Sequence, residues 1–242
     1  MPSVPDATGH RVFYLSPPWP DPGGDVLLSP EESRHAARVM RVRPSDALRV
    51  VDGEGREATA VAGALEGGRL RVRLTRIDRG TGEASRIGTL ALPWIRSAAR
   101  LEWALEKGTE LGVSDFAIFG ADRSVHRGLA AVEGKRERWR RITLAAMKQC
   151  GRASWPPVAV YPDLAALLAA DASAPLWVAD PAGETSVPPE APPRRILLVG
   201  SEGGWSGPEE ALLGARGALR LSLGPRRLRT ETAAIALCVK VG

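Results

Sequence analysis

The 242-residue chain has two cysteines, three histidines and no long apolar run. Cys150 and Cys238 are too few for the disulfide framework of a small secreted domain or for a cysteine zinc site. The histidines His10, His35 and His126 are scattered and have no metal-ligand spacing. We therefore expect that the protein uses no metal.

Segments for membrane insertion or export are also missing. No apolar run approaches the ~20 residues that span a bilayer, so no membrane partner is expected. Residues 1–10 lack the charged start and apolar middle of a signal peptide. The sequence therefore predicts a cytoplasmic protein.

Signatures of several common enzyme classes do not occur. The chain has no G-x-G-x-x-G, so a Rossmann dinucleotide site is not indicated, and no G-K-[ST] of a P-loop. The stretch from Gly200 to Gly203 is not G-x-S-x-G, and no histidine follows Ser201 to complete a catalytic triad. A hydrolase of this type would lack its nucleophile.

Most of the positive charge is arginine. The net charge is +5, the pI is about 9.7, and only four of the 33 cations are lysines. The planar guanidinium suits phosphates and base edges, although a GC-rich coding bias would give the same composition. A dense run of cations covers residues 123–152, and a smaller cluster covers residues 34–43. Either run can bind a phosphate backbone or be a solvated surface.

The first third of the chain predicts short strands and one helix. The helix, over 31–42, has Ser29 as its N-cap and Glu32 at the capping-box position. Short strands with glycine-rich turns are typical of a small barrel. A linker over 79–85 limits this domain to 1–82. The predicted strands are 11–15, 47–52, 57–62 and 69–77.

From residue 83 to residue 242, strands and helices alternate. Short apolar strands between helices predict a mostly parallel sheet with helices on both faces. The proline-rich stretch 181–193 is expected to be an exposed loop. Predicted strands are 87–92, 115–119, 158–161, 176–179, 196–199 and 218–223, and predicted helices are 97–111, 132–150, 208–215 and 230–241.

Two loops follow predicted strands and lead into helices. The first, 200–206, reads GSEGGWS, and the second, 224–232, reads GPRRLRTET. The carboxyl ends of the strands are where open α/β sheets bind ligands, and glycine allows close approach of the backbone to a ligand. One such loop could be an ordinary turn, but two, one of them rich in arginine, favour a ligand site.

Several segments carry a family resemblance. Lys107 to Val113 matches K-x-x-E-L-G-V, Gln149 to Arg152 matches Q-C-x-R, Val199 to Gly204 is similar to I-G-P-E-G-G, and Leu223 to Ala233 matches L-G-x-R-x-L-R-x-E-T-A. Near the start, residues 11–13, 35–41, 46 and 52–53 are similar to the same family. The sequence resembles the ribosomal RNA small subunit methyltransferase E family of the SPOUT (α/β-knot) superfamily. Ser201 departs from the pattern, because the family has proline there, and predicts a freer loop.

The resemblance implies a fold and an activity. It implies an α/β protein with an N-terminal PUA-like β-barrel and a C-terminal SPOUT methyltransferase domain, whose last segments thread a deep trefoil knot. It implies a homodimer that uses S-adenosyl-L-methionine to methylate N3 of one uridine in small-subunit (16S) ribosomal RNA during ribosome biogenesis. A target base inside an RNA helix would have to be splayed out first.

The resemblance and the loops together give the candidate site residues. The catalytic candidates are Arg229, to stabilise the uracil anion formed as the N3 proton leaves, and Glu231, as a base or as an acid favourable to its helix dipole. The cofactor-binding candidates are Val199, Gly200, Glu202, Gly203, Gly204, Leu223, Gly224, Leu228, Arg229 and Thr230. The RNA-binding candidates are Arg11, Arg38, Arg41, Gln149 and Arg152.

Three alternatives remain open at this point. A related SPOUT enzyme could act on transfer RNA, but the segment from His35 to Arg41 favours the ribosomal family. A non-catalytic RNA-binding or assembly protein could keep the fold and lose the cofactor, as Ser201 mildly suggests and the intact second loop opposes. A small-molecule α/β transferase is disfavoured by the arginine-rich run.

Overall fold

The computed structural model describes residues 11–79, 87–124, 130–189, 192 and 194–242. The chain forms two compact units, one of residues 1–83 with 147–155, the other of 84–146 with 156–242. Most of the predicted linker, together with Arg127 of the basic run, lies outside the described residues. No helix in the described part is long and apolar enough to cross a membrane.

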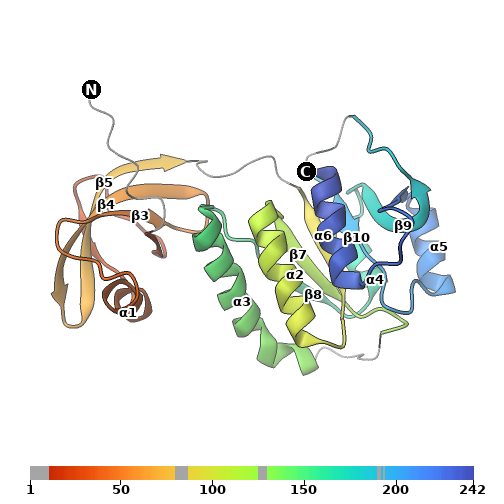
Figure 1. Ribbon diagram of the computed structural model, residues 1–242, viewed down its shortest axis with the longest axis horizontal. Coiled ribbons are helices and arrows are strands. Elements are labelled where there is room, and N and C mark those ends of the chain that lie inside the picture. Colours follow the sequence, from red (N-terminus) through yellow and green to blue (C-terminus); the bar gives the residue numbers. More distant parts are fainter. Residues whose placement is uncertain (1–10, 80–86, 125–129, 190–191, 193) are drawn as a thin grey trace. The chain divides into compact units, whose positions relative to one another are not determined.

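The first unit is a five-stranded sheet with one helix (Figure 1). In β5, Leu70, Val72 and Leu74 are buried, whereas Arg73 between them is exposed, as the alternation predicts. The strand order is β1-β3-β4-β5-β2, so β1 and β2 are the edge strands. The elements are β1 (Val12–Tyr14), β2 (Asp25–Leu27), α1 (Pro30–Arg38), β3 (Ala47–Val51), β4 (Arg56–Glu66) and β5 (Arg69–Arg79).

Helix α1 begins as predicted but ends early. The Ser29 side chain accepts a hydrogen bond from the backbone N–H of Glu32, which caps the first turn. The predicted helix to residue 42 is wrong, because the backbone N–H groups of Val39 and Met40 both donate to the His35 carbonyl. Arg41 then has φ 49°, which no right-handed helix accommodates.

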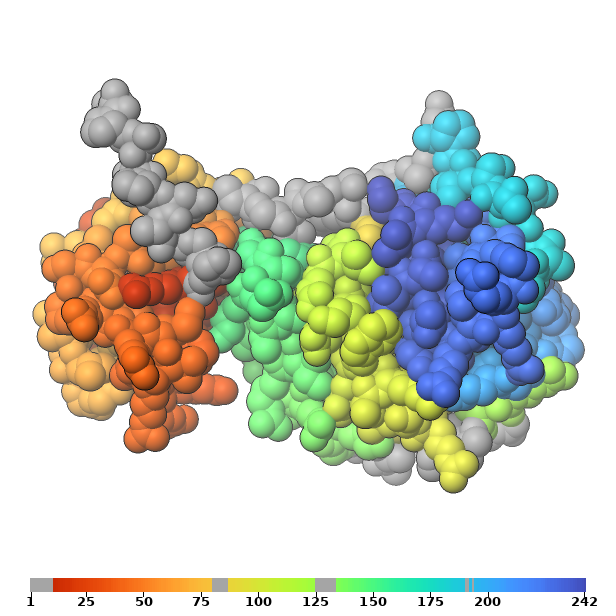
Figure 2. Space-filling model, viewed as in Figure 1, coloured from red at the N-terminus to blue at the C-terminus, as the bar shows by residue number. Residues whose placement is uncertain are grey.

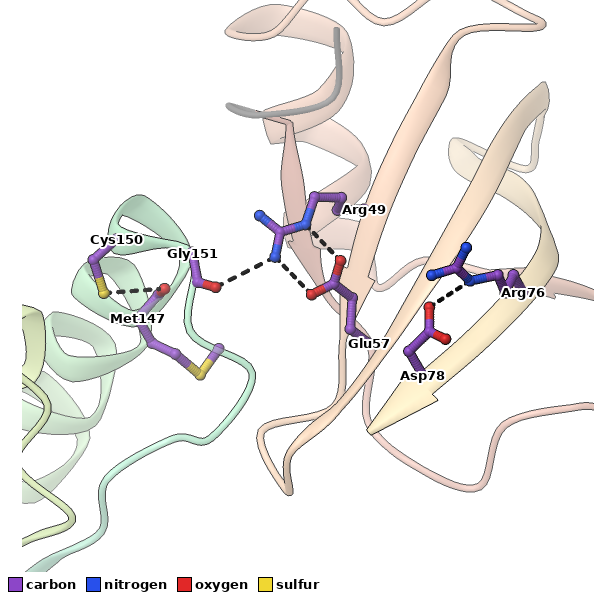
Figure 3. A network of polar contacts seen from close by, with 7 residues as sticks. All are labelled: Arg49, Glu57, Arg76, Asp78, Met147, Cys150 and Gly151. Carbon is purple, nitrogen blue, oxygen red and sulfur yellow. Dashed lines mark hydrogen bonds and ion pairs between the residues drawn. The ribbon is translucent and has the colours of Figure 1, made fainter. Parts of the chain in front are cut away.

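Residues Met147–Trp155, which the sequence places in the second domain, pack with the first unit. Arg49 donates two hydrogen bonds to the Glu57 carboxylate, at 2.6 and 2.8 Å, and a third to the carbonyl of Gly151 at 3.3 Å (Figure 3). The backbone N–H of Trp155 donates to the Gly53 carbonyl at 2.8 Å. These contacts fix the Q-C-G-R segment to the strands of the first unit.

The second unit has a six-stranded sheet of order β11-β9-β10-β6-β7-β8, whose pairs are all parallel. Strands and helices alternate along most of this unit, as predicted, but β10 follows β9 with no helix between them. They are β6 (Thr89–Pro93), α2 (Ala98–Leu111), β7 (Asp115–Phe119), α3 (Ala130–Cys150), β8 (Val158–Tyr161), α4 (Leu164–Ala170), β9 (Leu176–Glu184), β10 (Ile196–Leu198), α5 (Gly207–Ala215), β11 (Leu219–Leu221) and α6 (Thr230–Val241).

Helices cover both faces of this sheet. On one face, Leu105 of α2, Trp139 of α3 and Leu237 of α6 pack in one buried cluster, and α2 lies beside α6 (Figures 1 and 2). On the other face, Leu167 of α4 and Leu213 of α5 pack in a second cluster. Such double coverage explains why the strands are apolar on both sides.

Besides α1, three elements differ from the prediction. Strand β2 of the first unit was not predicted. Helix α4 was not predicted at all. Strand β9 runs to Glu184, into the stretch expected to be a loop. The register with β11 jumps from Val178 to Glu184, so Pro181 lies in an irregular part of the strand where it need not donate a ladder hydrogen bond.

Candidate cofactor-binding site

The two predicted loops meet at one edge of the second unit's sheet. The glycine loop (Gly200–Ser206) follows β10, and the arginine loop (Gly224–Thr232), whose last three residues begin α6, follows β11. Strands β9, β10 and β11 are neighbours in the sheet, so their carboxyl ends share this edge. A cavity of about 630 Å³ lies between them, within the range of small-molecule sites.

Two hydrogen bonds join the loops to each other. The Thr230 hydroxyl donates to the Gly200 carbonyl at 3.0 Å, and the Arg227 guanidinium donates to the Glu202 carbonyl at 3.1 Å. Thr230 is buried at the start of α6. The walls of the cavity are therefore held together by contacts between segments that are 25 to 30 residues apart.

The glycine loop is tightly folded. Gly204 has φ 76°, which favours glycine, and a Cβ on Gly203 would lie 2.9 Å from the Cβ of Arg123. Ser201 donates from its hydroxyl to the Gly204 carbonyl at 2.9 Å, and the Gly204 N–H donates to the Ser201 carbonyl at 2.8 Å. The serine therefore contributes a constraint of its own where the family has proline.

The glycine loop ends in a capped helix. Ser206 and Glu209 form a capping box at the start of α5. The Ser206 hydroxyl also donates to the Asp122 carboxylate at 2.6 Å, and the Asp122 N–H donates to the Glu209 carboxylate at 3.0 Å. The segment after β7 is thereby attached to the loop.

Nine of the ten predicted cofactor-binding residues line the cavity. They are Val199, Gly200, Glu202, Gly204, Leu223, Gly224, Leu228, Arg229 and Thr230. Gly203 does not line it, and its carbonyl accepts a hydrogen bond from Arg123 at 3.0 Å.

Several residues that line the cavity were not predicted from the sequence. Asp180 and Pro181 lie on β9, which the sequence did not connect with the loops. Trp205 of the glycine loop, which was not among the predicted cofactor-binding residues, lines the cavity and stacks on Phe119, with ring centroids 6.2 Å apart. Arg100 comes from α2, where nothing in the helical pattern marks it.

The charge of the lining is mixed. The arginines are Arg100, Arg226, Arg227 and Arg229, and the acids are Asp180, Glu202 and Glu210. Burial raises the pKa of the Asp180 carboxyl, but hydrogen bonds from Arg220 and the Ala182 N–H outweigh it, so the pKa is below its usual value. Asp180 is therefore ionised at neutral pH. No group of three potential metal ligands occurs among the described residues.

The two predicted catalytic residues lie at the start of α6 in different environments. Arg229 is the exposed N-cap residue and lines the cavity. Glu231 is buried, is not among the lining residues, and forms an ion pair with Arg100.

The five predicted RNA-binding residues all belong to the first unit. Arg38, Arg41 and Gln149 are exposed. Arg11 forms an ion pair with Asp46 at 2.6 Å, and Arg152 is only 5% exposed. The fold thus brings Gln149 and Arg152 into the same unit as the other three residues, which precede them by more than 100 positions in the sequence.

Comparison with known proteins gives the same boundary near residue 83, although the methyltransferase match also covers residues 147–155 of the first unit. The family model "RNA methyltransferase domain" matches residues 84–241, and "RNA methyltransferase PUA domain" matches residues 28–75. The ribosomal RNA small subunit methyltransferase E of Mycobacterium bovis is 34% identical over 96% of this chain and 90% of its own length.

Solved structures are similar over nearly the whole chain. The enzyme of that name from Neisseria gonorrhoeae, bound to S-adenosyl methionine, has a TM-score of 0.83 and 28% identity, covering 95% of each chain. A putative methyltransferase from Legionella pneumophila, in complex with the cofactor SAM, has a TM-score of 0.82 and 30% identity, covering 94% of this chain and 95% of its own. The chain has an α/β fold with a PUA-like domain, and it belongs to the ribosomal RNA small subunit methyltransferase E family of RNA methyltransferases.

Proposed function

We propose that this protein transfers the methyl group of S-adenosyl-L-methionine to N3 of one uridine in small-subunit (16S) ribosomal RNA. The observation that carries the proposal is the cavity at the carboxyl ends of β9, β10 and β11, where both family loop motifs meet beside four arginines. Relatives that match at least 95% of this chain are named ribosomal RNA small subunit methyltransferase E.

The residues of the cavity fit this cofactor. Its volume of about 630 Å³ suits a molecule of that size. Acidic and basic side chains on the same lining can pair with the ammonium and carboxylate of a methionine group. Leu223, Leu228 and Trp205 offer apolar surface to an adenine.

The chemistry needs positioning and charge stabilisation. When bound, the cofactor supplies an electrophilic methyl group on its sulfonium. The N3 proton of uracil must pass to solvent water, the negative charge spreads to O2 and O4, and N3 then bonds to the methyl carbon as the bond from that carbon to sulfur breaks. Arg229 is the proposed donor to these oxygens, because it is exposed and lines the cavity. The loops would hold the reactants in line, which lowers the entropic part of the activation barrier for methyl transfer.

The first unit is proposed to hold the RNA. Arg38, Arg41 and Gln149 have exposed side chains there, and exposed arginines suit phosphate contacts. Arg11 can exchange its contact with Asp46 for a phosphate. Arg152 is buried and would act through the backbone of its segment.

We also propose the finer fold and the assembly implied by the resemblance. A closed barrel in the first unit and a deep trefoil knot in the second are proposed from the family resemblance. A homodimer through the adjacent helices α2 and α6 is supported by their exposed side chains Trp103 and Val239. Sedimentation would show a dimer that Trp103→Asp and Val239→Asp together dissociate.

The function is tested by labelled methyl transfer to small ribosomal subunits from a strain without its own copy of the enzyme. Digestion and mass analysis should give N3-methyluridine as the sole labelled nucleoside. A different methylated nucleoside, or label in transfer RNA alone, would contradict the proposed substrate. No transfer and no cofactor binding in calorimetry would favour a non-catalytic RNA-binding protein.

A further inference from the structure

Arg100 and Glu231 form an ion pair beside the cavity. Arg100 comes from α2 and lines the cavity, with 38% of its side chain exposed. Glu231 comes from the first turn of α6, and its side chain is 10% exposed. The Arg100 Nε lies 3.4 Å from the Glu231 Oε1. The arginine is thus at the rim, with the carboxylate behind it.

Stability alone explains this pair poorly. The second carboxylate oxygen of Glu231 is buried and has no hydrogen-bond partner within the described parts of the chain. A buried carboxylate oxygen without a hydrogen-bond partner is costly, and an ion pair with a partly exposed arginine adds little net stability. What the pair does provide is a guanidinium whose orientation at the cavity rim is held by a buried neighbour.

The position of Arg100 indicates which group it meets. A base that enters the cavity leaves its sugar and phosphate at the mouth. A partly exposed arginine on a helix at that mouth can reach a backbone phosphate, and its planar fork matches phosphate geometry. The oxygens of the uracil and the carboxylate of the cofactor would lie deeper, beside the two loops.

We propose that Arg100, oriented by Glu231, binds a backbone phosphate of the RNA beside the nucleotide that enters the cavity. This inference rests on the proposed function. Glu231 is then a positioning residue, whose carboxylate acts through Arg100. Arg100 is a further substrate-binding residue, supplied by a helix outside the two motif loops.

The test measures RNA binding, cofactor binding and turnover separately. The affinity of the protein for unmodified small-subunit ribosomal RNA is measured by filter retention of the complex over a series of salt concentrations. Binding of S-adenosylmethionine is measured by calorimetry. Arg100→Ala should weaken RNA binding about tenfold and reduce the salt slope by about one. KM for RNA should rise by the same factor, whereas kcat and the affinity for S-adenosylmethionine should be nearly unchanged. Arg100→Lys should restore part of the affinity, because it keeps the charge but loses the fork.

Arg194→Ala is the matched control for loss of one positive charge. Arg194 is 81% exposed, pairs with Asp171, and precedes β10, so it lies at the opposite end of that strand from the cavity. Its removal should leave the salt slope unchanged. An equal loss in Arg194→Ala would overturn the proposal, because the effect would then come from net charge.

A double-mutant cycle tests the link between the two residues. Glu231→Gln should weaken RNA binding about threefold, and adding it to Arg100→Ala should cause no further loss. A fall in kcat without a change in RNA affinity, in either variant, would assign the residue to the chemistry and overturn the proposal. Weaker cofactor binding in Arg100→Ala, or no effect at all, would also overturn it. Methyl transfer by the wild-type protein is measured first. If the wild-type protein methylates the RNA, a negative result with the variants contradicts only the role of Arg100 and not the proposed function.

Discussion

The hydroxyl of Thr230 donates a hydrogen bond to the main-chain carbonyl of Gly200 at 3.0 Å, which joins the start of α6 to the glycine loop after β10. The two residues lie on opposite loops of the cavity, and both line it. The shape of the cavity therefore depends on a contact between two segments that are separated by α5 and β11.

Thr230→Val should loosen the cavity without changing its volume. Loss of one neutral hydrogen bond is worth about 1 kcal/mol, so the affinity for S-adenosylmethionine should fall about fivefold in calorimetry. Thr232→Val, at an exposed position of the same helix, is the control and should bind normally. Equal affinities of both variants for S-adenosylmethionine would show that the hydrogen bond between Thr230 and Gly200 does not shape the site.

Arg229→Ala should slow methyl transfer more than it weakens binding. Removal of one donor to a developing anion lowers kcat by about a hundredfold in other enzymes, and that reduction is expected in single-turnover transfer from the labelled cofactor. Arg226→Ala, which removes a neighbouring arginine of the same loop, should have the smaller effect on kcat. Normal methylation by Arg229→Ala would remove its catalytic role.

Asp180 should make the stability of the second unit depend on pH. Its folded-state pKa is below the ordinary 3.8, since the opposing hydrogen bonds outweigh the effect of burial. The stabilisation is therefore present above about pH 3.8 and is lost as pH falls through the lower folded value. Asp180→Asn should lower Tm by a few degrees at pH 7, for an ion pair worth about 1 kcal/mol. A Tm difference that persists undiminished at pH 2.5 would contradict this origin.

The two thiols should differ in reactivity. Burial raises the pKa of the Cys238 thiol to about 12, whereas Cys150 is only partly buried. Because the thiolate is the reactive form, a chromogenic disulfide reagent at pH 8 should modify one thiol in the native protein and two after denaturation. The native reaction should disappear in Cys150→Ser. Rapid modification of both native thiols would show that α6 is not packed as described.

Parts of the fold were predictable because local patterns decide them. Strands 115–119 and 158–161 and helix 230–241 have the predicted bounds, since each is an apolar run between clear turn signals. The shared edge of the two loops followed from the rule that ligands bind at the carboxyl ends of parallel strands. Ser29 and Gly112 were predictable as caps from their chemistry alone.

Other parts depend on tertiary contacts that no local pattern specifies. Strand β9 continues through Pro181 because the register shift with β11 tolerates a residue without an N–H. Arg100 reaches the cavity only because α2 packs beside α6. The segment from Met147 to Trp155 joins the first unit through Arg49 and Gly53, which are about 100 residues away.

The most direct test of the account is reverse transcription across small-subunit ribosomal RNA from subunits that lack the modification, before and after treatment with the protein and S-adenosylmethionine. A methyl group at N3 removes a base-pairing donor, so the account predicts one new strong stop, next to a uridine, that needs both protein and cofactor. The stop should be much weaker with Arg229→Ala. Methyl incorporation without any new stop, or stops at many uridines, would contradict methylation of N3 at a single site.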